Sequence, residues 1–150
     1  MNRFEYPVLL IPAEEGGFVV TCRDLPEVIT QGEDVIDALA EAADAMDEAF
    51  IARMQADESL PLPSNPCQGE YLVSPPAETV AKAALYIAMR EAGVTKIELA
   101  KRLGVDEKEI RRMLDPRHGT KLPRLAQAVG LLGKRLVINL EQTNHRQGPA

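Results

Sequence analysis

The sequence predicts an α+β protein in two parts, a small sheet with one long helix followed by a helical domain that ends in a strand. Short β-prone runs bounded by turn residues occupy the start of the chain and recur at residues 70–73, whereas residues 77–132 show helical periodicity. A proline-rich stretch separates the two patterns. The charge also changes sign: residues 1–75 hold three basic and fifteen acidic residues, net −12, and residues 76–150 hold fourteen and eight, net +6.

Length and composition set the broad limits. A chain of 150 residues with 45% apolar content suits two small globular domains, which we place at residues 1–75 and 76–142, with a disordered tail at 143–150. The apolar runs are too short to span a membrane and no signal peptide is visible. Cys22 and Cys67 match neither a metal pair nor a disulfide framework. We therefore predict a cytoplasmic protein without cofactor or metal.

The first 75 residues predict a sheet. Residues 4–11 and 18–22 are β-prone, and Glu14-Glu15-Gly16-Gly17 between them reads as a hairpin connection. Cys22 shares one strand face with Phe18 and Val20, which favours buried packing over a reactive thiol. Residues 28–30 and 70–73 predict two further strands.

A long helix follows the third strand. Asp34 can cap it, and apolar residues recur at intervals of three or four from Val35 to Met54. The remaining positions carry Asp37, Glu41, Asp44, Asp47 and Glu48. We interpret this segment as a helix packed on one face of the sheet, with an acidic outer surface.

In the second half we predict helices over residues 77–92 and 121–132, with two short helices joined by a tight turn at 96–115. Gly104 suits the left-handed residue that ends a helix, Asp106 can cap the next one, and Ala100 is small where the two helices cross. This spacing is typical of a helix-turn-helix whose second helix enters the DNA major groove. The alternative is an ordinary helical hairpin with a solvated charged face.

Candidate DNA contacts follow from this geometry. Arg111 or Arg112 is the expected base reader, because a guanidinium can bind a guanine edge through two hydrogen bonds. Backbone N–H groups at the first helix's start suit a phosphate, and the basic turn after the second helix could hold the DNA backbone. The candidate set is Thr95, Lys96, Glu107, Lys108, Arg111, Arg112, Arg117, His118 and Lys121.

Residues 134–140 alternate, with Leu136, Ile138 and Leu140 on one face, and so predict a strand. A lone strand in a helical domain needs a partner for its backbone groups. The economical partner is the same strand of a second copy, in a homodimer that places two recognition helices on one duplex. Pairing with the chain's own N-terminal sheet and a frayed tail are the alternatives.

An ordered set of N-terminal motifs resembles the HicB family of antitoxins, which pair with HicA toxins. The motifs are Tyr6-Pro7, Gly17-Phe18, Asp24-Leu25-Pro26, Thr30-Gln31-Gly32 and the helix from Asp34. Many family members have Pro and Gly where this chain has Arg23 and Glu27, which leaves the turn geometry open. The C-terminal half resembles the helix-turn-helix variant of the family.

The resemblance implies a partial ribonuclease H-like domain that binds and occludes a HicA-type mRNA-cleaving toxin, and a C-terminal domain that represses the shared operon by binding operator double-stranded DNA. A cationic toxin suits the −12 half, because opposite charges speed and orient encounter. Candidate toxin contacts are the exposed side and edge of the sheet, the turn at Asp24, Leu25 and Pro26, and the helix face of Asp37, Glu41, Asp44 and Glu48.

Other functions are less well supported by the residues. Ribonuclease H chemistry needs carboxylates that converge on two cations, whereas the acidic residues here fall at the spacing of a solvated helix face. His118 and His145 are each isolated, so no catalytic triad is indicated, and we predict no enzyme. The alternative function is a stand-alone repressor whose N-terminal domain oligomerises or senses a ligand. A short basic toxic gene beside this one would decide for the antitoxin.

Overall fold

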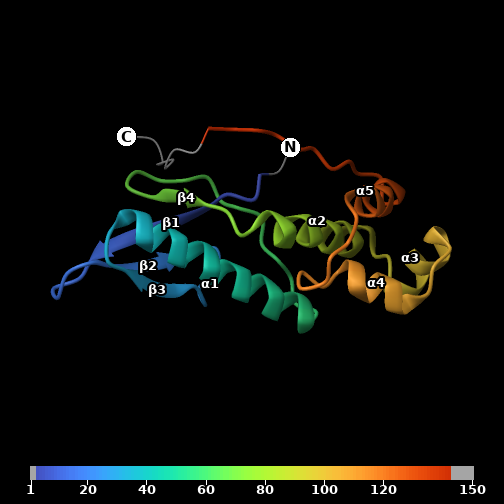
Figure 1. Ribbon diagram of the computed structural model, residues 1–150, viewed down its shortest axis with the longest axis horizontal. Helices are drawn as coiled ribbons and strands as arrows, with labels where there is room; N and C mark the ends of the chain where they lie inside the picture. The colour runs from blue at the N-terminus through green and yellow to red at the C-terminus, as the bar shows by residue number, and fades with distance from the viewer. Residues whose placement is uncertain (1–2, 143–150) are drawn as a thin grey trace. The chain divides into compact units, whose positions relative to one another are not determined.

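The computed structural model describes residues 3–142, a mixed α/β chain with a four-stranded antiparallel sheet and, in these residues, five helices (Figure 1). The α+β prediction is confirmed at this level. The strands are β1 (Tyr6–Pro12), β2 (Phe18–Cys22), β3 (Ile29–Gly32) and β4 (Tyr71–Val73). The helices are α1 (Val35–Gln55), α2 (Ala77–Ala92), α3 (Lys96–Leu103), α4 (Glu107–Met113) and α5 (Leu122–Leu131).

The chain divides into two compact units. Residues 3–52 and 61–77 belong to the first, and residues 53–60 and 78–141 belong to the second. Residues 53–60, predicted to belong to the first domain, thus group with the second unit. Their backbone explains why, since the hydroxyl of Tyr86 donates to the carbonyl of Glu58 (2.5 Å) and Arg90 donates to that of Asp57 (3.0 Å).

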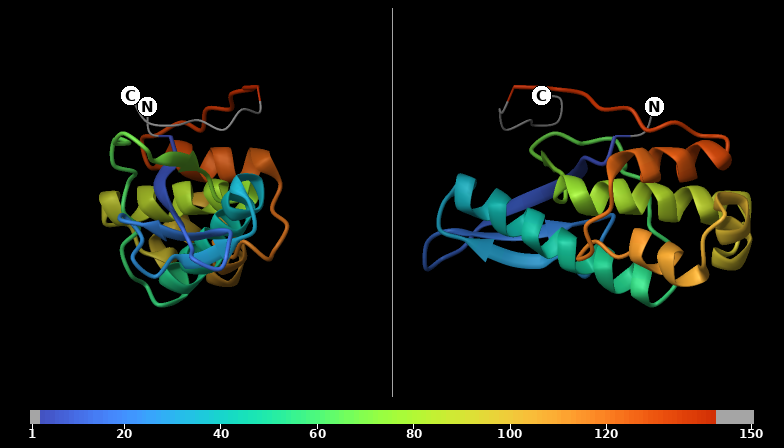
Figure 2. Two further views of the ribbon diagram at one scale, coloured as in Figure 1. Left: turned by 90° about the vertical axis from the view of Figure 1, so that its left-hand side faces the viewer. Right: turned by 45° about the vertical axis from the view of Figure 1, so that its right-hand side comes forward.

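The sheet of the first unit has the order β3-β2-β1-β4, with α1 across one face (Figures 1 and 2). Alternate strand residues point toward the helix, because side chains of a strand alternate between faces. Tyr6, Val8, Val20 and Cys22 are buried on this side, and the Tyr6 ring meets Phe50 of α1 edge-on at 5.6 Å. The prediction that Cys22 is core packing is confirmed.

The start of α1 packs directly on glycine backbone. A β-carbon on Gly32 would lie 2.3 Å from the backbone nitrogen of Ala38 and 2.4 Å from its α-carbon. A β-carbon on Gly17 would lie 2.5 Å from the carbonyl oxygen of Gly32. Two glycines of the N-terminal motifs are therefore required because β2, β3 and the first turns of α1 approach too closely for side chains.

The turn after β2 is fixed by side chains of the loop at residues 61–70. Arg23 donates to both carboxylate oxygens of buried Glu70 (3.0 and 3.1 Å) and to the Asn65 carbonyl (2.6 Å). Asp24 accepts from the backbone N–H and the hydroxyl of Ser64. The hydrogen bonds from Arg23 hold the pKa of Glu70 below its usual value. Arg23 thus fixes the turn whose geometry the sequence left open.

The second unit contains α2 to α5 around an aliphatic core that includes Leu85, Leu99, Ile110, Met113 and Leu125. Residues 134–142 have no regular secondary structure, so the predicted strand at 134–140 is wrong for the single chain. The described strands of the sheet are β1 to β4, so residues 134–140 form no strand of it. Leu136 is half-buried, whereas Ile138 and Leu140 are exposed. The predicted disordered tail lies outside the described residues.

Candidate functional site

The helices α3 and α4 are joined by a tight, well-capped turn. The hydroxyl of Thr95 accepts from the N–H of Glu98, and the carboxylate of Asp106 accepts from that of Glu109. Gly104 is left-handed (φ 70°, ψ 34°), as its position after α3 predicts. Ala100 is buried. Ile97 of α3 is 54% exposed.

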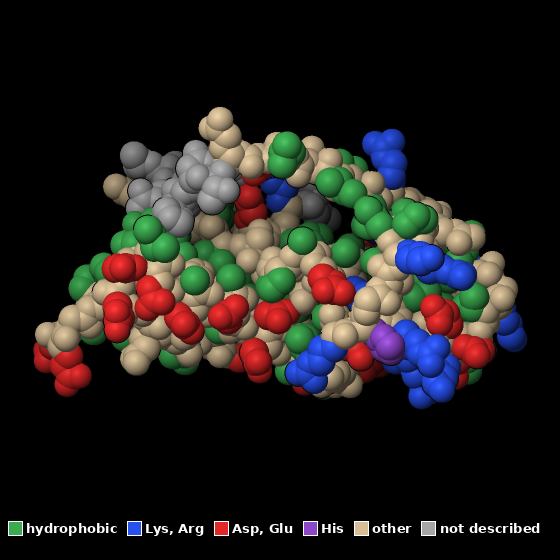
Figure 3. Space-filling view, viewed as in Figure 1, with side chains coloured by type: hydrophobic (Ala, Val, Ile, Leu, Met, Phe, Trp, Pro, Cys, Tyr) green, Lys and Arg blue, Asp and Glu red, His purple; other side chains and the backbone are tan. Residues whose placement is uncertain are grey.

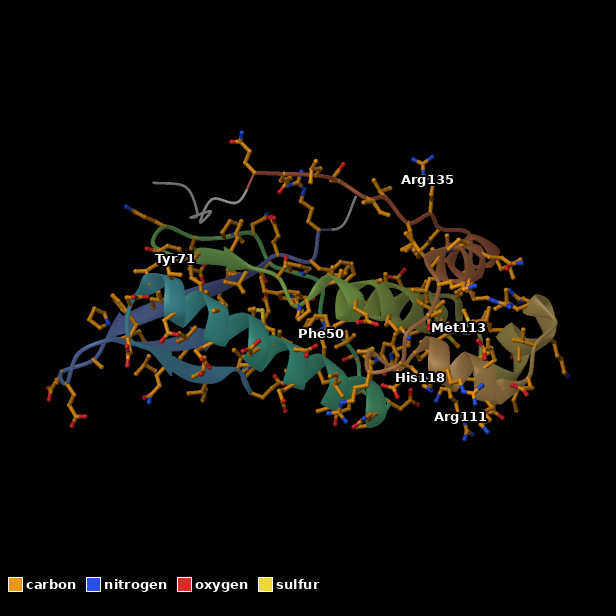
Figure 4. The ribbon with its side chains drawn as sticks, viewed as in Figure 1. Phe50, Tyr71, Arg111, Met113, His118 and Arg135 are labelled. Carbon is orange, nitrogen blue, oxygen red and sulfur yellow. The ribbon has the colours of Figure 1, made fainter. Side chains whose placement is uncertain are left out.

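The outer face of α4 is basic. Ile110 and Met113 are fully buried, so Lys108, Arg111 and Arg112 project away from the core. Lys and Arg side chains gather over α4 in the space-filling view, and Figure 4 shows Arg111 pointing outward.

Each arginine of α4 has an acidic neighbour on the same helix. Arg111 pairs with Glu107 at 2.9 Å, and Arg112 pairs with Glu109 at 3.5 Å. Such exposed pairs contribute only about 0.3–0.5 kcal/mol each, so they do not commit the guanidinium groups to the protein. Both arginines therefore remain available to an external anion.

The other predicted DNA contacts flank α4. Thr95, Lys96 and Glu107 line one shallow hollow at the start of α3. Arg117, His118 and Lys121 are exposed on the turn that follows α4. Figure 4 places His118 on the same side of the unit as Arg111. The structure thus brings the predicted residues to the ends and outer face of one helix pair.

The acidic surface of the first unit runs along α1, where Asp and Glu side chains form a row (Figure 3). Glu41, Asp44 and Glu48 are exposed and line a shallow groove beside Thr30 of β3. Asp37 has a different task, because its carboxylate accepts from the N–H of Glu33 and helps cap α1. Glu41, Asp44 and Glu48 therefore remain available to a partner.

The sheet face opposite α1 is apolar and open. Leu9 of β1 pairs with Thr21 of β2, and Thr21 pairs with Ile29 of β3. Strands β1, β2 and β3 therefore all contribute side chains to this face. Leu9, Ile11 and Ile29 are 42%, 44% and 69% exposed. An uncovered apolar sheet face of this kind marks a place where a partner can bind.

The turn at residues 24–26 is a weaker candidate than predicted. Leu25 is fully buried, so its side chain is core and the prediction that it contacts a partner is wrong. The carboxylate of Asp24 accepts hydrogen bonds from Ser64 and is half-buried. Of the three residues, Pro26 is the exposed one. A single leucine between Asp24 and Pro26 belongs to no helical or strand periodicity, so no pattern in the sequence signals its burial.

Sequence reasoning missed one polar residue in the second unit. Lys82 of α2 has no exposed surface. It lies on the apolar stripe with Thr79, Leu85 and Met89, so helical periodicity could have identified it.

Among the described residues, no group of His, Cys, Asp and Glu is arranged to hold a metal ion. Over the same range, no helix combines the length and apolar content that a membrane span requires.

Residues 5–84 match the family model described as "HicB_like antitoxin of bacterial toxin-antitoxin system". The chain is 38% identical to Antitoxin HicB of Escherichia coli (strain K12) over 131 residues, 87% of this chain and 95% of the relative. It is 36% identical to Antitoxin HicB 1 of Photorhabdus laumondii subsp. laumondii over 141 residues, 94% and 90% of the two chains. Antitoxin HicB of Pseudomonas fluorescens (strain Pf0-1) is 32% identical over 141 residues, 92% and 94%.

These matches make the chain an antitoxin of a bacterial toxin–antitoxin system. It belongs to the HicB-like antitoxin family, as the N-terminal motifs indicate. Membership implies a toxin as partner.

Proposed function

We propose that this antitoxin neutralises a HicA-type, mRNA-cleaving toxin by direct binding through its first unit and represses its own operon by binding operator DNA through its second. The observation that carries the DNA-binding half is the α3–α4 pair, whose capped turn at Gly104 directs Arg111 and Arg112 outward. That layout suits a helix-turn-helix with α4 in the major groove. The first unit corresponds to the partial ribonuclease H-like domain of the family.

The toxin-binding half rests on two surfaces of the first unit. The α1 carboxylates of Glu41, Asp44 and Glu48 offer a negative field to a basic toxin, which speeds and orients encounter. The apolar side chains of Leu9 and Ile29 offer the area whose burial gives affinity. The proposed action is occlusion of the toxin, as the resemblance to the family implies.

Reversing the charge of the α1 face tests this assignment. We expect a Glu41→Lys/Asp44→Lys/Glu48→Lys variant to associate with the cognate toxin at least tenfold more slowly at low salt, since electrostatic steering is lost. Stopped-flow association at several ionic strengths measures this. Glu14→Lys/Glu15→Lys, in the exposed hairpin of the same unit, is the control for charge reversal. If both variants bind at the wild-type rate, the α1 face has no part in toxin binding.

Self-association would complete a DNA-binding unit. Ile138 is 74% and Leu140 100% exposed in the single chain, so the segment 134–140 has apolar side chains and backbone groups that a second copy could pair. A symmetric strand pair would carry two copies of α4 to one duplex.

Charged residues on this segment should separate the copies. We expect Ile138→Asp/Leu140→Asp to sediment as a monomer and to bind operator at least tenfold more weakly, because one-site binding loses the advantage of two linked contacts. Sedimentation equilibrium and fluorescence anisotropy measure the two effects. Val137→Asp, on the opposite face of a strand, is the control. A dimeric double variant would exclude this segment as the interface.

A further inference from the structure

The side chain of Lys82 ends in a cage of oxygen atoms. Its Nζ lies 2.8 Å from the carbonyl oxygens of Arg112 and Asp115, 2.5 Å from that of His118 and 2.7 Å from the hydroxyl of Thr120. Lysine is almost never fully buried unless its charge is matched, and here three backbone carbonyls and one hydroxyl match it. All four oxygens belong to one short segment, from the end of α4 through the turn that follows.

The oxygens favour the charged form of the amine. An ammonium has three protons to donate, whereas a neutral amine has two and would turn its lone pair toward an oxygen. The carbonyls at the end of α4 also carry the partial negative charge of a helix C-terminus. Burial lowers the pKa of Lys82, while the carboxylates of Glu78, Asp115 and Glu109 act against this shift.

The caged segment is the one that carries the predicted backbone contacts to DNA. Arg112 is on α4, Arg117 and His118 are in the turn, and Lys121 follows Thr120 directly. The carbonyls of Arg112 and His118 are six residues apart in the chain, and one ammonium holds both. We infer that Lys82 is a positioning residue for DNA binding, a built-in cation that fixes the turn after α4 so that its basic side chains can meet phosphate. This inference rests on the proposed function of the second unit.

The chemistry of the cage provides a specific test. Carbonyl and hydroxyl oxygens are ligands that replace the hydration shell of a monovalent cation such as K⁺. Truncating Lys82 to alanine removes the ammonium group and leaves the four oxygens that bound it around the space that the lysine side chain filled. Added ammonium or K⁺ should then enter that space and restore the turn, whereas choline is too large.

Fluorescence anisotropy at constant ionic strength measures how each Lys82 variant changes the operator affinity of the full chain. We expect Lys82→Met and Lys82→Ala to bind operator at least tenfold more weakly in choline chloride, with toxin neutralisation unchanged. Ammonium chloride should restore several-fold affinity to Lys82→Ala and none to Lys82→Met, whose side chain fills the space. Wild-type affinity in Lys82→Met, or a loss in Lys82→Ala that no cation repairs, would overturn the inference.

Two further measurements keep the test decisive. Thr120→Val removes one oxygen at a half-buried position and should weaken operator binding several-fold even if both Lys82 variants fail to fold. Without DNA, the amide hydrogen exchange of residues 115–121 should be faster in Lys82→Ala than in the wild type. Added ammonium should slow it again. If exchange behaves in this way but the wild type binds no operator, the proposed function fails while the cage stands. Unchanged exchange would refute the cage itself.

Discussion

Arg111→Ala should remove operator binding while leaving toxin neutralisation intact. The side chain of Arg111 is 66% exposed and its partner in the structure is Glu107 on the same helix, a pair worth about 0.3–0.5 kcal/mol to folding. A bidentate guanidinium contact with guanine is worth roughly 1–3 kcal/mol, or about 5- to 150-fold in affinity for each copy of α4. The effect on DNA therefore far exceeds the effect on the fold.

A gel shift with the operator and a growth assay with the cognate toxin measure the two activities. Arg135→Ala makes the same change in charge at a position that Figure 4 places away from Arg111, and it should bind operator within a few-fold of wild type. If Arg111→Ala keeps both activities or loses both, the assignment of DNA binding to the outer face of α4 is contradicted.

Gly32→Ala should have the largest effect on the first unit. The added β-carbon would lie 2.3 Å from the Ala38 nitrogen and 2.4 Å from its α-carbon, and backbone atoms cannot rotate away as a side chain can. The start of α1 must shift from β3, which we expect to cost about 3 kcal/mol or more, at the upper end of overpacking effects. Urea denaturation and loss of toxin neutralisation measure this.

Gly130→Ala is the matched control, because a β-carbon there meets no atom within 4 Å and the residue lies inside α5. Alanine in a helix should be neutral or stabilise by up to about 1 kcal/mol. A Gly32→Ala variant as stable as the wild type would show that α1 does not depend on this close approach.

The sequence predicted the elements well wherever local chemistry determines them. The periodicity of residues 77–92 corresponds to α2. Gly104 has the predicted left-handed backbone conformation, and Asp106 caps α4 as predicted. The alternation that placed Cys22 in the core is likewise present. In each case the responsible residues are adjacent in the chain, so their spacing alone carries the information.

Features that depend on distant residues could not be predicted in this way. The pairing of Arg23 with Glu70 depends on how a proline-rich loop returns to the turn after β2. The oxygens around Lys82 come from a segment 30 to 38 residues further on. The alternation at residues 134–140 predicted a strand that no element within the described chain pairs, because a strand needs a partner that periodicity does not supply.

Residue-resolved amide chemical shifts of the full chain, recorded first with operator DNA and then with the cognate toxin, test most directly whether the two tasks are divided between the two units. The account predicts that DNA shifts signals from residues 95–121 and the toxin shifts signals from the sheet and α1 of the first unit. Toxin-induced shifts concentrated on α4, or DNA-induced shifts concentrated on α1, would contradict it.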